Sequence, residues 1–122
     1  MIRELRKAEY DLIVYLLKGK ISKDQVIGKP STMLVEEMND GGMGSLKFLY
    51  SSKTQQEFRE QLAEITLLDK DGVPVSFAIN LDTDGDIYEL DVFKADFSTL
   101  IEFPMPPYNE LPPNETISNN PI

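Results

Sequence analysis

The stretch from residue 57 to residue 97 constrains the fold more than any other part of this chain. In residues 73–81 every odd position carries a large apolar side chain, and every even position carries Pro, Ser, Ala or Asn. This period of two predicts a strand with one buried face, because a helix would scatter the same side chains around its axis. Asp71-Gly72 and Asp84-Gly85 flank the strand, and such pairs favour tight hairpins. We therefore predict three antiparallel strands over 61–68, 73–81 and 87–96.

The alternation also predicts which side chains face the core. In the middle strand these are the odd positions, and they should contact the leucines and Ile13 of the N-terminal segment. In the third strand we place one set of side chains on one face (Tyr88, Leu90 and Val92) and the remainder on the other (Ile87, Glu89, Asp91 and Phe93).

The remaining segments extend this sheet and cover it. Residues 3–18 have apolar side chains at helical spacing and predict an amphipathic helix. Residues 32–38 and 46–50 read as strands on either side of a glycine-rich loop. The expected fold class is therefore α+β, with the N-terminal helix packed on an antiparallel sheet of about five strands.

Length and composition predict one domain followed by a tail. A chain of 122 residues suits a single core. Prolines break any regular element after residue 103. We expect residues 1–103 to form the single α+β domain and residues 104–122 to form a Pro/Asn-rich extended tail, partly packed by Met105, Tyr108 or Leu111.

The charge and the missing residue types exclude several classes of function. The net charge is −9, and residues 31–122 hold five Lys/Arg against seventeen Asp/Glu, so we expect no nucleic-acid partner. The chain has no Cys and no His, which removes Ser-His-Asp and Cys-His hydrolase chemistry and thiolate metal sites. No apolar run is long enough to span a bilayer. We expect no cofactor, no metal, no membrane partner and a cytoplasmic location.

The loop over residues 39–45 is the first candidate binding site. A phosphate cradle would need a helix after the glycines, whereas residues 46–50 read as a strand. Two interpretations stay open, namely a structural hairpin loop and a partner-binding loop in which Met43 makes the contact. Its candidate binding residues are Asn39, Asp40, Gly41, Gly42, Met43, Gly44 and Ser45.

Carboxylates near the second hairpin turn are the second candidate. The spacing of Asp82, Asp84 and Asp86 is similar to that of a calcium loop, but Ile87 and Phe93 occupy the positions where an EF-hand needs Gly and Glu. A hydrated hairpin tip is the plainer interpretation. In the third strand, the side chains of Glu89 and Asp91 point the same way, about 6 to 7 Å apart.

Two segments, residues 38–46 and 84–98, resemble a family of small bacterial proteins of unknown function. Its members are single domains with a leucine-rich N-terminal helix, a "DGGMGSL" loop and a closing "ELD-F/W-K-DFS" segment. The resemblance covers roughly residues 3–103. It brings no known activity, so it transfers no catalytic role to this chain.

Three functional hypotheses follow from these features. The favoured one is a protein-interaction module that neutralises or regulates a basic partner. The alternative is a small-ligand-binding domain that uses the glycine loop and the third strand, where Asp91, Lys94 and Asp96 supply polar groups. These three charged residues have a plainer interpretation as well, because charges on an edge strand prevent edge-to-edge aggregation of sheets. An enzyme with the carboxylate pair Glu89 and Asp91 is least favoured. A homo-oligomer is compatible with all three.

Overall fold

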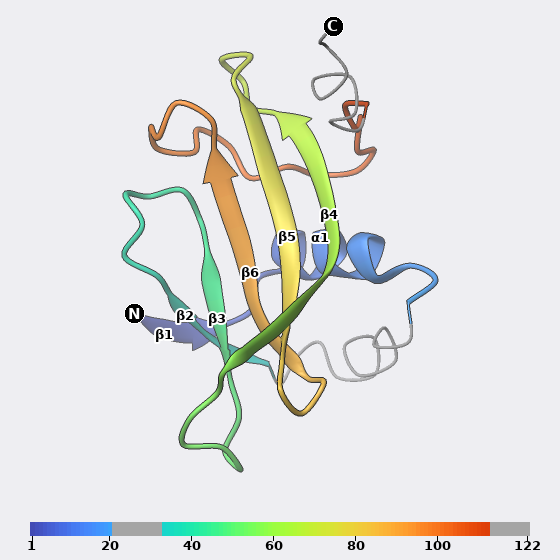
Figure 1. The fold of residues 1–122 in the computed structure, drawn as a ribbon. Coiled ribbons are helices and arrows are strands. Elements are labelled where there is room, and N and C mark those ends of the chain that lie inside the picture. The colour runs from blue at the N-terminus through green and yellow to red at the C-terminus, as the bar shows by residue number, and fades with distance from the viewer. Residues whose placement is uncertain (21–32, 113–122) are drawn as a thin grey trace, which may run out of the picture.

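The computed structural model describes residues 1–20 and 33–112. Its strands form one antiparallel sheet in the order β1-β2-β3-β6-β5-β4 (Figure 1). The elements in chain order are β1 (Ile2–Glu4), α1 (Lys7–Leu17), β2 (Leu34–Glu37), β3 (Leu46–Leu49), β4 (Phe58–Leu68), β5 (Pro74–Asp82) and β6 (Ile87–Lys94).

The expected fold class, α+β with about five strands, is wrong, because the protein is mostly β. The sheet has six strands, and α1 has only 11 residues. The additional strand, β1, includes Arg3 and Glu4, which fall inside the predicted helix over residues 3–18. Residues 2–4 pair with β2, and the Leu5 N–H donates to the Met33 carbonyl at 3.0 Å, so the helix begins at Lys7. No helix among the described residues is long and apolar enough to span a bilayer.

The predicted orientation of β5 is confirmed. Its odd positions are almost completely buried, with at most 3% of each residue exposed, and they share the core with apolar residues of α1. We call this face of the sheet the inner face. Helix α1 and the segment after β6 cover it, whereas the opposite, outer face is turned to the viewer in Figure 1. The inward residues of β5 are Val75, Phe77, Ile79 and Leu81.

The predicted faces of β6 are wrong at its first two residues. Leu81 pairs with Ile87 and Asn80 pairs with Glu89, which leaves Tyr88 as an extra residue on β6. This bulge turns Ile87 into the core, where it is 1% exposed. Tyr88 joins the outer face, and the Nζ of Lys47 lies 6.0 Å from the centre of its ring.

The chain after β6 returns along the inner face. The ring of Phe103 contacts Phe77 edge-on at 5.9 Å, and the ring of Tyr108 lies 4.7 Å from that of Tyr15. At the free edge of β4, the Leu111 N–H donates to the Thr66 carbonyl at 2.9 Å. Residues 104–112 therefore contact α1 and β4. The division of the chain at residue 103 stays a prediction, and residues 113–122 lie outside the described residues.

Candidate functional site

The candidate residues named from the sequence lie in two regions of the molecule. The glycine loop and Lys94 meet at one end of the sheet, on its inner side. Glu89 and Asp91 lie on the outer face of β6. Asp96 lies in the turn after β6, where one of its oxygens accepts hydrogen bonds from the backbone N–H and the hydroxyl of Ser98 at 3.0 and 2.6 Å. The two regions use their charges differently.

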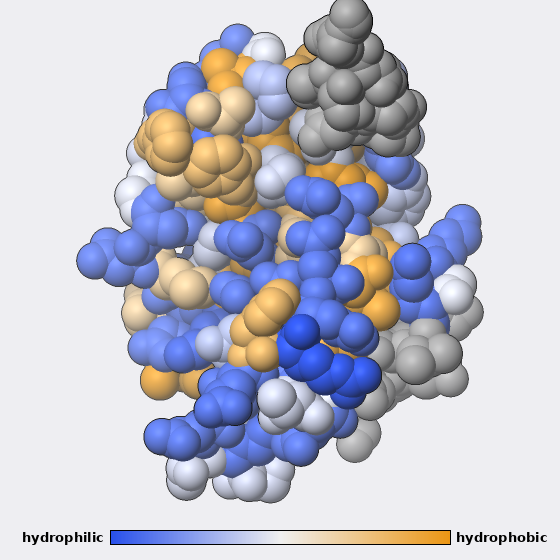
Figure 2. All heavy atoms as spheres, in the orientation of Figure 1, coloured by the Kyte–Doolittle hydropathy of each residue, from blue (hydrophilic) through white to orange (hydrophobic). Residues whose placement is uncertain are grey.

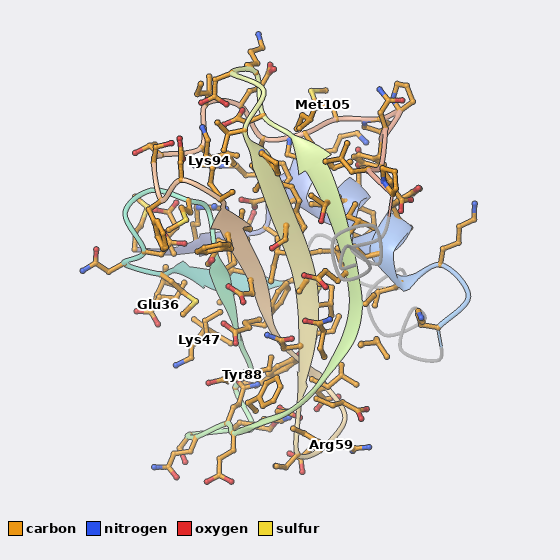
Figure 3. The ribbon with its side chains drawn as sticks, turned by 45° about the horizontal axis from the view of Figure 1, so that its top comes forward. Glu36, Lys47, Arg59, Tyr88, Lys94 and Met105 are labelled. Carbon is orange, nitrogen blue, oxygen red and sulfur yellow. The ribbon has the colours of Figure 1, made fainter. Side chains whose placement is uncertain are left out.

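Lys94 is a fully buried cation at the end of β6, beside the loop between β2 and β3 (Figure 3). Its ammonium group donates to the carboxylates of Asp69 and Asp71, each at 2.8 Å, and to the Thr99 carbonyl at 3.1 Å. An ammonium group has three donors, so its hydrogen-bonding capacity is filled within the fold. A ligand could reach Lys94 only by breaking one of these bonds.

Asp69 is the principal partner of Lys94 and is itself saturated. Burial raises its pKa, but backbone N–H donors from Ile101, Lys70 and Glu102, together with the Lys94 ammonium, outweigh burial and hold the pKa at about 2. The N–H of Ile101 lies 2.7 Å from one carboxylate oxygen. This arrangement, which we call the Lys94 cluster, joins the β4–β5 turn, β6 and the segment 99–102.

The glycine loop is held by bonds inside the protein. The Asp40 carboxylate accepts the backbone N–H groups of Met43 and Ser45 at 3.1 and 3.0 Å. The buried Ser45 hydroxyl both donates to the Val92 carbonyl and accepts the Val92 N–H. The sulfur of Met43 accepts the backbone N–H of Lys94 at 3.3 Å. These contacts favour the interpretation of this segment as a structural loop.

The glycine loop also contacts the segment that follows β6. The Leu100 N–H donates to the Gly42 carbonyl, and the Thr99 hydroxyl donates to the Gly41 carbonyl, both at 3.1 Å. Gly42 has a φ of +83°, and a Cβ built at this position would lie 3.0 Å from the methyl carbon of Thr99. Glycine is therefore required here both for backbone conformation and for close approach. The two segments that carry the family resemblance meet beside this contact, through the bonds between Ser45 and Val92 and between Met43 and Lys94.

The aspartates of the second hairpin turn hold a lysine. The Nζ of Lys53 lies 2.6 Å from Asp82, 3.2 Å from Asp84 and 2.7 Å from Asp86. Burial raises the pKa of Asp82, but hydrogen bonds from Lys53, Gln56 and backbone N–H groups hold it at about 2. Glu89, which follows this turn in β6, accepts a hydrogen bond from the Asn80 amide. A metal ion at this turn would have to displace the Lys53 ammonium.

On the outer face, the outward side chains of β5 are smaller than most of those that flank them on β4 and β6. Register places residues of β6 and β4 on either side of each outward residue of β5. Neighbouring strands are about 4.8 Å apart, so residues facing each other across β5 have backbones about 10 Å apart. We call this region the outer groove. Its rows are Phe93–Ser76–Thr66, Asp91–Ala78–Glu64 and Glu89–Asn80–Gln61.

The carboxylates of the outer groove have no cation among the described residues. Within residues 1–20 and 33–112, no ion pair is formed by Glu64, Glu89 or Asp91. Burial raises the pKa of Glu89, and the charge of Asp91 adds to this rise. The Asn80 amide at 3.2 Å and the charge of Lys47 oppose it. Lys47 is opposite Glu89 in the register, yet its ammonium lies over Tyr88.

Apolar and polar features lie at the two ends of the outer face. At one end Phe93 and Phe97 are 42% and 70% exposed, with ring centres 5.1 Å apart and nearly perpendicular rings. Figure 2 shows this face as hydrophilic over its centre, with a hydrophobic patch at the upper left, where β6 ends in Figure 1. Beside β3 there is a polar hollow of about 500 Å³, to which Glu36 and Lys47 contribute. These two side chains lie near each other in Figure 3.

Sequence reasoning missed Glu64 and Phe97, and it named Lys94 without its inward direction. The signal for an inward Lys94 was present, because it continues the alternation of Leu90 and Val92. Glu64 lacked a signal, because only the pairing of β4 with β5 brings it opposite Asp91. Phe97 also lacked one, because its outward position depends on a turn made after the strand ends.

Comparisons with known proteins identify a family without assigning an activity. Searches of curated proteins and of solved structures find no match to this chain. Residues 2–104 match the family described as a domain of unknown function, DUF6984. This match agrees with the resemblance to an uncharacterised family. Because it spans most of the sequence, the chain belongs to the family of this domain of unknown function.

Proposed function

We propose that this protein is a protein-interaction module of the bacterial cytoplasm that binds a basic protein partner through the outer groove. One observation carries the proposal. The uncovered outer face holds three carboxylates, those of Glu64, Glu89 and Asp91, that pair with no cation among the described residues. The cations on the inner side and at the hairpin tip are, by contrast, enclosed by acidic groups.

The electrostatics of Glu89 favour a cationic partner. Burial raises its pKa, which means that the ionised form of Glu89 is less stable here than it would be in water. A lysine or arginine brought next to Glu89 would stabilise the ionised form, and the carboxylate would stabilise the bound cation equally. Complementary charge of this kind increases the rate of association and selects against acidic partners.

The small-ligand alternative at the glycine loop has less support. It depended on Lys94 as a polar group for the ligand, and all three donors of Lys94 are used inside the fold. The enzyme hypothesis depended on Glu89 and Asp91 acting together in a cleft. Both project from the same strand onto a shallow outer face, where water reaches the exposed Asp91.

A synthetic peptide with alternating lysine and valine tests the proposal by isothermal titration calorimetry. The peptide should bind the wild-type protein, and binding should weaken as salt increases. The triple variant Glu64→Gln, Glu89→Gln, Asp91→Asn should bind it at least about tenfold more weakly, because each charge-assisted contact contributes about 1 kcal/mol or more. A peptide in which glutamate replaces lysine should not bind. Sedimentation of the protein alone identifies any self-association.

A charge-matched control separates recognition from net charge. The variant Glu57→Gln, Asp84→Asn, Glu102→Gln loses the same three charges from exposed positions outside the groove. It should bind the lysine peptide as the wild type does. Equal weakening in both triple variants, or no binding to the wild type, would overturn the proposal.

A further inference from the structure

Phe97 adopts a backbone conformation that its side chain disfavours. Its φ is +65°, and no other non-glycine residue within the described ranges has a positive φ. A bulky aromatic residue in this region is an outlier, and its backbone is strained. The ring is nevertheless 70% exposed, so burial in the core does not compensate for this strain.

Contacts on both sides hold the turn that presents Phe97. Its N–H donates to the Lys94 carbonyl at 2.9 Å, directly after the buried end of β6. On the other side, Ser98 is bonded to the Asp96 carboxylate. Leu100 then joins the chain to the glycine loop. The Lys94 cluster and the glycine loop therefore fix the position of an exposed ring.

The ring of Phe97 lies against the ring of Phe93, at one end of the outer groove. It contacts Phe93 edge-on, with the ring planes at 83°. Phe93 and Asp91 are two residues apart on the same strand and point outward together, about 7 Å apart. Ser76, the neighbour of Phe93 on β5, is small and leaves space beside the ring. Two aromatic surfaces and an unpaired carboxylate are thus brought together at the end of the groove.

We propose that Phe93, Phe97 and Asp91 form a recognition site for an arginine side chain of the partner. This rests on the proposed function and names the contact that anchors it. The guanidinium group stacks on an aromatic face and donates hydrogen bonds to the Asp91 carboxylate. Arginine suits this site better than lysine, because its planar cation is weakly hydrated and stacks on aromatic rings. The fixed turn reduces the entropy lost on binding.

The test compares two synthetic peptides, one with alternating arginine and valine and one with alternating lysine and valine, on the wild type and on Phe97→Asn. The wild type should bind the arginine peptide at least about fivefold more tightly. Phe97→Asn should remove this preference and leave the affinity for the lysine peptide nearly unchanged. Its melting temperature should stay the same or rise, because asparagine tolerates the positive φ.

Phe58→Asn is the matched control, because Phe58 is 55% exposed and lies at the start of β4. It should keep the arginine preference. Equal affinity of the wild type for both peptides would overturn the arginine site and leave the proposed function intact, whereas no binding of either peptide would contradict the proposed function itself. If both Phe97→Asn and Phe97→Gly lower the melting temperature by many degrees, the ring is structural and the proposal fails.

Discussion

Lys94 and Asp91 lie three residues apart on β6 and use their charges in opposite ways. Lys94 faces inward, is fully buried, and has every donor bonded to the protein. Asp91 faces outward, is exposed, and has no ion-pair partner among the described residues. Lys94, whose bonds are all made inside the fold, holds chain segments together. Asp91, which is left without an ion pair at the surface, is accessible to a partner.

The physical cost of each charge explains this difference. A buried ammonium is tolerated only when its hydrogen bonds are complete, because desolvation costs several kcal/mol per ion. An exposed carboxylate loses little when it stays in water, and exposed pairs contribute about 0 to 1 kcal/mol. Removing one side of the Lys94 cluster should therefore harm folding, while removing an outer carboxylate should harm binding alone.

The largest effect is expected from Asp69→Asn. In this variant Asp71 is the one carboxylate that still pairs with the buried Lys94 ammonium. Removing one partner of a buried ion pair costs about 3 kcal/mol or more of folding free energy. Urea unfolding followed by circular dichroism measures the loss. Asp91→Asn is the control on the outer face and should change the free energy of unfolding by less than about 0.5 kcal/mol. Equal effects of the two variants would abolish the distinction between the regions.

Acid should affect the two regions with opposite sign. The pKa values of Asp69 and Asp82 are lowered to about 2, below the value of about 3.9 in an unfolded chain. Their stabilisation is complete above about pH 4 and is lost between about pH 4 and about pH 2. The raised pKa of Glu89 acts in reverse, because its protonation favours the folded state.

Thermal melts at a series of pH values measure this dependence. The melting temperature should hold or rise slightly as Glu89 is protonated and should then fall below about pH 4. In Glu89→Gln the early rise should disappear while the later fall remains. In Asp69→Asn the fall should become shallower. A wild-type melting temperature that stays constant down to about pH 2 would contradict the assigned role of the buried aspartates.

A smaller effect should distinguish two neighbouring glycines. Gly41 and Gly42 have similar φ values, +80° and +83°, but only Gly42 has an atom close to a built Cβ. Gly41→Ala should cost about 1 kcal/mol for backbone strain, and Gly42→Ala about 2 kcal/mol, because the methyl group also meets Thr99. Equal costs in denaturant unfolding would show that the close approach to Thr99 contributes nothing. Neither variant should change peptide binding while folded.

Much of the sheet was predictable from local pattern. The alternation in β5 and the two Asp-Gly pairs specify the hairpins, because the conformation of a turn and the side-chain period are local properties. The same alternation, continued by one step, turns Lys94 inward. Its partner Asp69 could be placed beside it only through the pairing of three strands, since β5 lies between the two.

Local pattern failed where pairing overrode it. Arg3 and Glu4 belong to β1 instead of the start of a helix, because the edge of β2 offers this segment hydrogen bonds. Ile87 and Tyr88 exchange faces because a bulge inserts one residue, and a shift of one residue reverses side-chain direction in a strand. The observed fold class differs from the expected one for the same reason. The sheet has one strand more than expected, and the helix is one turn shorter.

The sequence alone determined the hairpins, the inward face of β5, the acidic charge and the absence of thiol and imidazole chemistry. Tertiary structure decided the strand order, the saturation of Lys94, the row that places Glu64 across from Asp91, and the exposed position of Phe97. The physical reason is the range of each interaction. Turn and strand preferences act between neighbouring residues, whereas these contacts join residues that are distant in the chain and that only the assembled sheet brings together.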